Sequence, residues 1–395
     1  MTNDLLTACD NGSVSILSLL DLSAAFDTLD HAILIKRLSE SFGFKGTALA
    51  WFQSYLEGRT QSVVVGGGSS RLASLMYGVP QGSVLGPILF TLYVQPLGHI
   101  IRQHNMLYHM FADDTQLQKS AEPKKFNQLV CDVQSCGESV KVWMTNNKLK
   151  MNQEKTDIIP VATEHKLKSI SNQSNLLFCG SSISFSSSVR NLGVFLDSTL
   201  SMETHINRLR RTLFLELRRI GHIRPYLSLN ATKKLVSAFV LSRMDYCNSL
   251  FAGLPDLKLD RLQRIQNNAA RLVLGRRKHD HATPLLKSLH WLPIKARIEY
   301  KIALLCYNCL KSTGPSYLRD MLTLYQPSRS LRSADSGHLC IPRIKLNTYG
   351  KRSFAFVGPT TWNSLPKQLR DCSSVPAFKT ALKTHLFRKH FPDAN

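Results

Sequence analysis

The spacing of apolar and polar residues in the first half of the chain predicts a mixture of strands and helices. Residues 13–20 (SVSILSLL) form an apolar run of strand length, and residues 61–65 (QSVVV) are β-rich and lead into a glycine turn. Helices are predicted over residues 27–38, 44–60 and 126–148. This half therefore combines both kinds of element.

Shorter signals lie between these elements. Residues 78–87 (GVPQGSVLGP) are punctuated by glycine and proline, which predicts a loop, and residues 88–101 after it have a helical pattern. Two short strands flank Ala112–Asp114 and predict a hairpin. Residues 190–197 (RNLGVFLD) read as a single short strand.

After residue 200 the pattern changes to long basic helices. Within residues 202–223 the apolar residues fall three or four apart, on one helical face: Ile206, Leu209, Leu213, Leu217 and Ile220. In the helix predicted over 260–277, Arg261, Arg264 and Arg271 form a second, basic stripe. We therefore divide the chain into residues 1–200, 201–324 and 325–395; the last part is less regular until a predicted helix at 377–391.

The net charge of the chain lies entirely in its second half. The total is +23, and residues 1–200 hold 16 basic and 16 acidic side chains, whereas residues 201–395 hold 34 and 11. Such an asymmetry indicates a polyanionic partner, either nucleic acid or an anionic membrane. A basic surface without a partner is the alternative.

The nine cysteines indicate an intracellular protein with reduced thiols. Their number is odd, and no secretory signal precedes them. Cys306 and Cys309 form one CxxC in a helical segment, but no second ligand pair follows at zinc-finger spacing. The apolar run at 14–20 is too short to cross a membrane.

Three carboxylates are candidates for a metal site. Asp21 follows the strand at 13–20, and Asp113 and Asp114 lie in the predicted hairpin. If these strands are neighbours, the carboxylates converge, and ligation by oxygen alone suits Mg²⁺. Two ions about 4 Å apart can activate a hydroxyl and stabilise a leaving group. Two turn aspartates and an unrelated strand-end aspartate are the alternative, and spacing alone does not decide between them.

Five stretches, in order, resemble motifs A to E of the reverse transcriptases. They are LLDLSAAFDTLDH, YGVPQGSVLGPILF, FADDTQL, KLKMNQEKTD and NLGVFLD. The residues within these motifs are most similar to those of LINE-type non-LTR retrotransposons. Three further stretches resemble the C-terminal part of the same elements: SRMDYCNSLFAGLP, LHWLPIKARIEYK and WNSLPKQLR. The resemblance covers nearly the whole chain.

The resemblance implies a fold and an activity. The fold is an α+β right-handed polymerase palm with a small antiparallel sheet over residues 1–200, a helical thumb-like basic region over 201–324, and a basic C-terminal region over 325–395. The activity is RNA-directed DNA polymerisation for retrotransposition. A catalytically inactive nucleic-acid-binding remnant of a truncated element is the alternative. Binding to a membrane surface is disfavoured, because the apolar helix faces are needed for a core.

The resemblance also assigns catalytic roles. Asp21 and Asp113 match the metal-bridging carboxylates and Asp114 the third acid, with two Mg²⁺ ions, or Mn²⁺ as an alternative. Lys155 matches a general acid for pyrophosphate, and Phe26 matches the gate that excludes ribonucleotides. From the residues alone, Phe26 could equally be a core aromatic and Lys155 a solvated loop lysine. Phe at position 111, where many reverse transcriptases have Tyr, keeps the ring.

The remaining assignments concern nucleic acid: an RNA template, a DNA primer and deoxynucleoside triphosphates. The residues with these implied roles are Pro80, Gln81 and Gly82 at the template–nucleotide pair, Leu192, Gly193 and Val194 in the primer grip, and Arg261, Arg264 and Arg271 at the nucleic-acid backbone. Only 20 residues precede Asp21, so we expect neither fingers nor endonuclease. We expect the protein to act in the nucleus and cytoplasm as a ribonucleoprotein, without a membrane.

Overall fold

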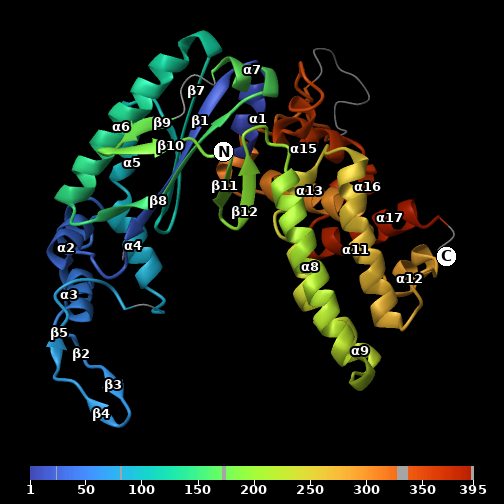
Figure 1. Cartoon of the computed structure of the whole chain (residues 1–395), viewed down its shortest axis with the longest axis horizontal. Coiled ribbons are helices and arrows are strands. Elements are labelled where there is room, and N and C mark those ends of the chain that lie inside the picture. Colours follow the sequence, from blue (N-terminus) through green and yellow to red (C-terminus); the bar gives the residue numbers. More distant parts are fainter. Residues whose placement is uncertain (24, 81, 171–174, 327–336, 393–395) are drawn as a thin grey trace. The chain divides into compact units, whose positions relative to one another are not determined.

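The chain forms two units of contacts in the computed structural model (Figure 1). One unit contains Gly12–Val189, and the other contains Arg190–Asn395 together with Thr2–Asn11. The structure describes residues 1–23, 25–80, 82–170, 175–326 and 337–392. The division into residues 1–200, 201–324 and 325–395, which was made from the change in residue pattern, stays a prediction.

A four-stranded antiparallel sheet lies at the centre of the first unit. Its strand order is β6-β7-β1-β8, with β6 at Leu107–Phe111, β7 at Asp114–Ala121, β1 at Val14–Ser23 and β8 at Lys150–Val161. The predicted strand and hairpin are confirmed, and β1 continues past residue 20 through Asp21. The expected α+β class with a small antiparallel sheet is likewise confirmed.

Helices pack on this sheet and form the core of the first unit (Figure 1). The long helix α6 (Phe126–Asn146) contacts β1, β7 and β8, and its Val133 and Val140 are fully buried with Ile16 of β1. Burying each such side chain contributes about 1.5–3 kcal/mol. The other helices of this unit are α2 (His31–Glu40), α3 (Gly46–Leu56), α4 (Gly86–Val94), α5 (Leu97–Gln103) and α7 (Glu164–Ser169).

Short strand pairs complete the first unit. The pairs are β2 (Thr60–Gln61) with β5 (Ala73–Ser74), β3 (Val64–Val65) with β4 (Gly68–Ser69), and β9 (Asn175–Phe178) with β10 (Ser181–Ser184). The two pairs between residues 60 and 74 are exposed throughout.

The second unit is mainly helical, as predicted. Its longer helices are α8 (Glu203–Ile223), α9 (Leu229–Val236), α11 (Asp256–Leu274), α12 (Ala282–Ser288), α13 (Ile294–Leu310), α15 (Phe354–Asn363) and α17 (Val375–His390). Shorter turns are the π-helical η3 (Ser237–Leu241), α10 (Ser242–Asp245), η4 (Asn248–Phe251), α14 (Ser316–Arg319), η6 (Gly350–Arg352) and α16 (Lys367–Arg370). The apolar stripe predicted for residues 202–223 is the buried side of α8.

Three predicted elements differ from the structure for local reasons. Helix α2 begins at His31, because the Asp30 carboxylate caps it by accepting a hydrogen bond from Ile33 N (2.9 Å). The predicted helix 88–101 is two helices that meet at Pro96, which has no N–H to donate. The predicted strand 190–197 is a hairpin of β11 (Ser188–Asn191) and β12 (Val194–Asp197).

The N-terminal helix α1 (Thr2–Asp10) packs within the second unit. Its Leu5 and Cys9 are fully buried. The Asp10 carboxylate accepts hydrogen bonds from Lys345 N (3.1 Å) and Leu346 N (2.5 Å), and its side chain is only 8% exposed. Polar contacts from α1 thus hold a segment that lies more than 300 residues away in the sequence.

The replacement Asp10→Ala is expected to destabilise the second unit by about 1–3 kcal/mol, because two backbone N–H groups lose a charged acceptor whose side chain is buried. Urea unfolding followed by far-ultraviolet circular dichroism measures the change. Thr7→Ala, at an exposed position of the same helix, is the control and should change stability by less than about 0.5 kcal/mol. Equal stability of the two variants would contradict this role of Asp10.

Candidate active site

The central strand β1 brings Asp21 between two neighbouring strands. Leu20 pairs with Thr115 of β7, so continuation of the antiparallel register places Asp21 beside Asp114. On the other side, Asp21 pairs with Asn152 of β8 after a shift in register. The three segments that resemble motifs A, C and D therefore meet at one end of the sheet.

Asp113 lies in the two-residue turn of the β6–β7 hairpin. Phe111 pairs with Asp114, which leaves Ala112 and Asp113 to close the hairpin. Ala112 has a φ of 53°, a left-handed conformation that is unfavourable for a residue with a Cβ. Backbone strain of this kind is found at functional sites, where the surrounding structure enforces it.

The carboxylates at this end of the sheet influence one another electrostatically. The pKa of Asp114 is raised, first by burial and then by the negative charges of Asp113 and Asp21. The ammonium Nζ of Lys155 lies 3.6 Å from Asp21 Oδ2, with the lysine side chain 70% exposed and the aspartate 24%. Asp21 Oδ2 is buried and accepts no hydrogen bond from the part of the chain that the structure describes.

This arrangement is suited to a cation but is not a closed ligand set. Among the residues placed in the structure, no group of three or more His, Cys, Asp or Glu side chains lies close enough to hold a metal ion. Asp21 Oδ2, which accepts no hydrogen bond in the described part of the chain, and the mutual repulsion around Asp114 both favour a cation, and all the donors are carboxylate oxygens, which suit Mg²⁺. The residues therefore fit a divalent ion, once their side chains close around it.

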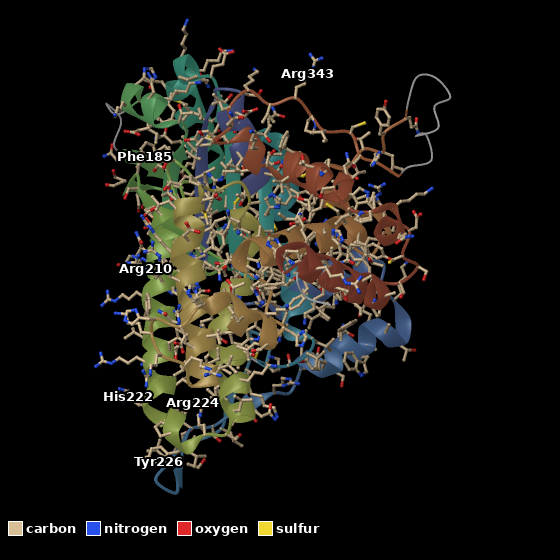
Figure 2. The ribbon with its side chains drawn as sticks, turned by 90° about the vertical axis from the view of Figure 1, so that its right-hand side faces the viewer. Phe185, Arg210, His222, Arg224, Tyr226 and Arg343 are labelled. Carbon is tan, nitrogen blue, oxygen red and sulfur yellow. The ribbon has the colours of Figure 1, made fainter. Side chains whose placement is uncertain are left out.

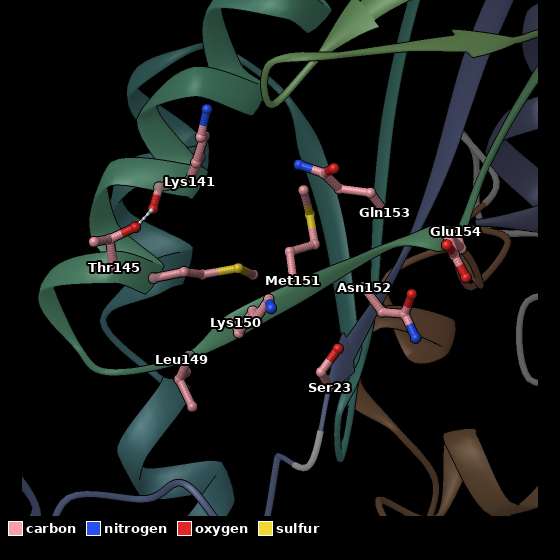
Figure 3. A pocket seen from close by; sticks show the side chains of 10 residues that line it. Ser23, Lys141, Thr145, Leu149, Lys150, Met151, Asn152, Gln153 and Glu154 are labelled. Carbon is pink, nitrogen blue, oxygen red and sulfur yellow. Dashed lines mark hydrogen bonds between the residues drawn. The ribbon is translucent and has the colours of Figure 1, made fainter.

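A cavity of about 380 Å³ lies beside Asp21, between α6 and β8. Ser23 and Asn152 lie at one end of it and Lys141 at the other (Figure 3). Lys150, which pairs with Ser23 across the sheet, is a further cation in its lining. The cavity is thus lined by two lysines and two small polar side chains.

The loop after Tyr77 is held against the turn that follows Asp21. Gly78 N donates to Leu29 O (2.7 Å), Val79 N donates to Phe26 O (2.8 Å), and His31 Nε2 donates to Gly78 O (2.7 Å). Gly78 has a φ of 86°, and a Cβ there would lie 2.9 Å from the carbonyl oxygen of Asp27. Sequence reasoning missed Gly78 and His31, although a glycine opening the proline loop was a signal.

The structure places most of the residues assigned to the incoming nucleotide around this turn. The half-buried Phe26 ring packs on Phe90 of α4, with ring centroids 5.0 Å apart. Pro80 is half-buried, and Gly82 is exposed with a φ of 81° and open space around it. Gln81 lies outside the described residues.

A second cavity, of about 580 Å³, lies along the same loop. Asp27, His31, Arg59 and Pro80 are among its lining residues. Arg59 donates to Tyr55 O (2.7 Å) and lies over the Tyr55 ring, so its position is fixed from α3. The lining of the cavity thus includes an acidic side chain, Asp27, a basic one, Arg59, and the imidazole of His31.

Leu192 and Gly193 form the tight turn between β11 and β12. Their φ angles are 44° and 82°, and two left-handed residues are typical of the type I′ turn of a hairpin. Tyr246 supports the turn: its hydroxyl donates to Leu192 O (2.7 Å), and a Cβ on Gly193 would lie 3.5 Å from its ring. Val194 is buried, whereas Leu192 is 37% exposed.

The three arginines assigned to nucleic acid differ in their surroundings. Arg261 pairs with Glu203, and this ion pair lowers the pKa of Glu203. Arg271 donates to Asp280 O (2.9 Å) and to Asn268 Oδ1 (3.0 Å). Arg264 is exposed on α11. Two of the three therefore hold the second unit together, and one faces solvent.

The exposed side of α8 is a larger basic surface, within the region of long basic helices predicted after residue 200, although its individual arginines were not assigned to nucleic acid. Figure 2 shows Arg210 and His222 projecting from this helix. Its exposed cationic residues are Arg208, Arg210, Arg211, Arg218 and Arg219. Arg208 lies over the Phe195 ring at 4.0 Å. The signal was the arginine content of the helix between the apolar positions. We name these five arginines the α8 basic face.

The structure contains no helix, among the residues it describes, that is long and apolar enough to span a membrane. All nine cysteines are free, as the sequence predicted.

Solved structures with partial similarity include the telomerase of Candida albicans in complex with a telomeric RNA fragment. That match has a TM-score of 0.32 and 16% identity, and covers 73% of this chain and 47% of the other. The Candida tropicalis telomerase matches with a TM-score of 0.33 and 15% identity, over 75% of this chain and 48% of the other.

Sequence comparison finds relatives among Drosophila melanogaster mobile elements. The RNA-directed DNA polymerase from mobile element jockey is 23% identical over 283 residues, which is 70% of this chain and 30% of the relative. The probable RNA-directed DNA polymerase from transposon BS is 24% identical over 76% of this chain and 33% of the relative. The chain thus spans about a third of the length of the curated relatives it matches. The model of the family described as reverse transcriptase (RNA-dependent DNA polymerase) matches residues 2–195, and this part of the chain belongs to that family.

Proposed function

We propose that this chain copies RNA into DNA by two-metal nucleotidyl transfer, with the reaction at the end of β1. The observation that carries the proposal is the buried Asp21 Oδ2, which accepts no hydrogen bond from the described residues, next to Asp114, whose pKa is raised by burial and by the charges of Asp113 and Asp21. A sheet that accumulates negative charge in this way is expected to bind cations.

Asp21, Asp113 and Asp114 would hold the metal ions, which are Mg²⁺ or alternatively Mn²⁺. When bound, two such ions supply activation of the primer 3′-hydroxyl and stabilisation of the leaving pyrophosphate. To bind these ions, the three carboxylates must be ionised and must point toward one common position. Asp113 is carried on the two-residue turn of the β6–β7 hairpin, at the end of the sheet where Asp21 and Asp114 lie.

Lys155 compensates the charge of Asp21 and would protonate the leaving group. Its ammonium lies 3.6 Å from Asp21 Oδ2 while most of the side chain is exposed, so the ammonium can leave Asp21 without disturbing the core. The released ammonium would then reach the pyrophosphate as a general acid.

Phe26 would act as the sugar gate, and Pro80, Gln81 and Gly82 would support the template–nucleotide pair. The Phe26 ring rests on Phe90, and the backbone carbonyl oxygen of Phe26 accepts a hydrogen bond from Val79 N, directly before Pro80. Gly82 lies in open space, which permits close approach of a base pair to the backbone.

The RNA template and the DNA primer would be held by two further elements. The exposed turn at Leu192 and Gly193, supported by Tyr246, is suited to contact the primer end. The α8 basic face and Arg264 would contact phosphates, an interaction that releases counterions and weakens with salt. The free cysteines, two of them exposed, are consistent with action in the reducing nucleus and cytoplasm as a ribonucleoprotein.

The replacement Asp113→Asn is expected to abolish primer extension on poly(rA)/oligo(dT) with Mg²⁺, by about 1,000-fold or more, because the amide cannot supply a charged ligand. The control Glu164→Gln removes one exposed carboxylate of α7 and should extend normally. If the unaltered chain binds RNA in a salt-sensitive way, unchanged by Asp113→Asn, but never extends a primer, the non-catalytic alternative is correct.

Asp114→Asn is expected to raise the melting temperature at pH 7 without metal by about 1–3 °C. Because the folded-state pKa of Asp114 is raised, its ionisation opposes folding above that pKa. The penalty disappears as the pH falls through the raised pKa toward the ordinary value, so the difference between variant and unaltered protein should shrink from pH 7 to pH 4.

Differential scanning fluorimetry across this pH range measures the effect of Asp114→Asn. Added Mg²⁺ should raise the melting temperature of the unaltered protein and have a smaller effect on the variant. A variant that is less stable at pH 7, or that gains as much from Mg²⁺, would contradict the assignment of Asp114.

Phe26→Val is expected to raise the incorporation of ribonucleotides relative to deoxynucleotides by about tenfold, because the shorter side chain no longer meets the 2′-hydroxyl. The ratio of the two kcat/KM values in primer extension is the measurement. Phe52→Val, which removes a ring of α3 that packs on Phe44, is the matched control. An unchanged ratio in Phe26→Val would identify its ring as a core side chain only.

A further inference from the structure

A cavity of about 560 Å³ in the second unit has no part in the proposed catalytic site. It lies between η3 and α10 on one side and α13 on the other, and Trp291 and Lys383 of α17 also line it. Its volume is within the range of small-molecule pockets.

The charges that line this cavity leave a positive surplus. Asp245 and Arg297 neutralise each other: Arg297 Nε donates to Asp245 Oδ1 (2.8 Å), and Arg297 Nη2 donates to Asp245 Oδ2. Lys301 and Lys383 also line the cavity, and neither has an ion pair with any carboxylate that the structure describes. Two uncompensated ammonium groups at one cavity favour an anionic ligand.

Asn248 provides an independent sign of a ligand. Its side chain lines the cavity and is only 4% exposed. The amide nitrogen donates to Asp245 Oδ1 (3.4 Å), which orients the group, and the buried Oδ1 has no hydrogen-bond partner in the described part of the chain. Buried acceptors are normally satisfied. The missing partner is therefore an N–H or O–H donor.

The rest of the lining is apolar and aromatic. Leu241, Leu292 and Leu304 contribute aliphatic surface, and Tyr300 contributes a ring whose hydroxyl pKa is raised by burial. Beside them, η3 is π-helical over Ser237–Leu241, a wider turn that is frequent at functional sites. Inorganic phosphate would leave this apolar surface unused, and an acyl chain would leave Asn248 Oδ1 unpaired.

We propose that this cavity binds one unpaired nucleotide of an RNA strand. The base lies against Tyr300 and the leucines and donates an N–H to Asn248 Oδ1, while Lys301 and Lys383 contact its phosphates. Single-stranded RNA is recognised in this way, through splayed bases on aromatic side chains. The inference rests on the proposed function only in requiring that the chain binds RNA; a free nucleotide offers the same chemistry.

The test compares two double variants in binding a short fluorescent oligo(A) at physiological salt by fluorescence anisotropy. Lys301→Ala with Lys383→Ala is expected to weaken binding about tenfold. The control, Lys295→Ala with Lys379→Ala, removes the same charge from the same two helices outside the cavity, and should weaken it less than about twofold. Tyr300→Leu, which changes no charge, is expected to weaken binding about fivefold or more.

Ultraviolet crosslinking of the oligonucleotide, mapped by mass spectrometry, is expected to label Trp291 or Tyr300. If the two double variants bound oligo(A) with equal affinity, or if all crosslinks mapped to residues outside the cavity, the cavity proposal would be contradicted. RNA binding by the chain would still stand. Adenosine monophosphate that binds as tightly as oligo(A) would contradict RNA as the source of the nucleotide. Failure of the unaltered chain to bind oligo(A) at all would contradict the proposed function itself.

Discussion

Repulsion among three carboxylates at one end of the β6-β7-β1-β8 sheet is the constraint on which the first unit depends. Asp21 must lie on the central strand to be flanked on both sides, and Asp113 must be carried on a turn that forces Ala112 into a left-handed conformation. Lys155 relieves part of the charge at Asp21. The rest of the electrostatic repulsion among the carboxylates destabilises the folded state, and a bound cation would remove it.

The second unit distributes its positive charge between two tasks. Arg261 and Arg297 are each paired with a carboxylate and join helices to one another. Lys301 and the α8 basic face, in which only Arg219 has an ion pair among the described residues, remain available to an anion. The net charge of +23 therefore overstates the surface that can contact nucleic acid, because a part of the basic residues is used inside the unit.

What the sequence could predict was local. The strand before Asp21, the hairpin around Ala112–Asp114 and the amphipathic α8 depend on residues within a few positions of one another, and they were predicted. The turn at Leu192 was missed, because a leucine in a left-handed conformation has no sequence signal and is stabilised by Tyr246 from another element. The partner of Arg261 was equally invisible, since Glu203 lies 58 residues away. Contacts over such distances are set by the fold.

The contact of α1 with the second unit fixes an order of events during synthesis. Asp10 leaves the ribosome 335 residues before Lys345, the first backbone group it binds. At typical elongation rates this interval is about 20–70 s, during which Leu5 and Cys9 have no core to enter. The strand that begins at Val14 can pair with β7 much sooner. The nascent protein thus carries an apolar helix without its docking surface, directly before a strand that can already pair.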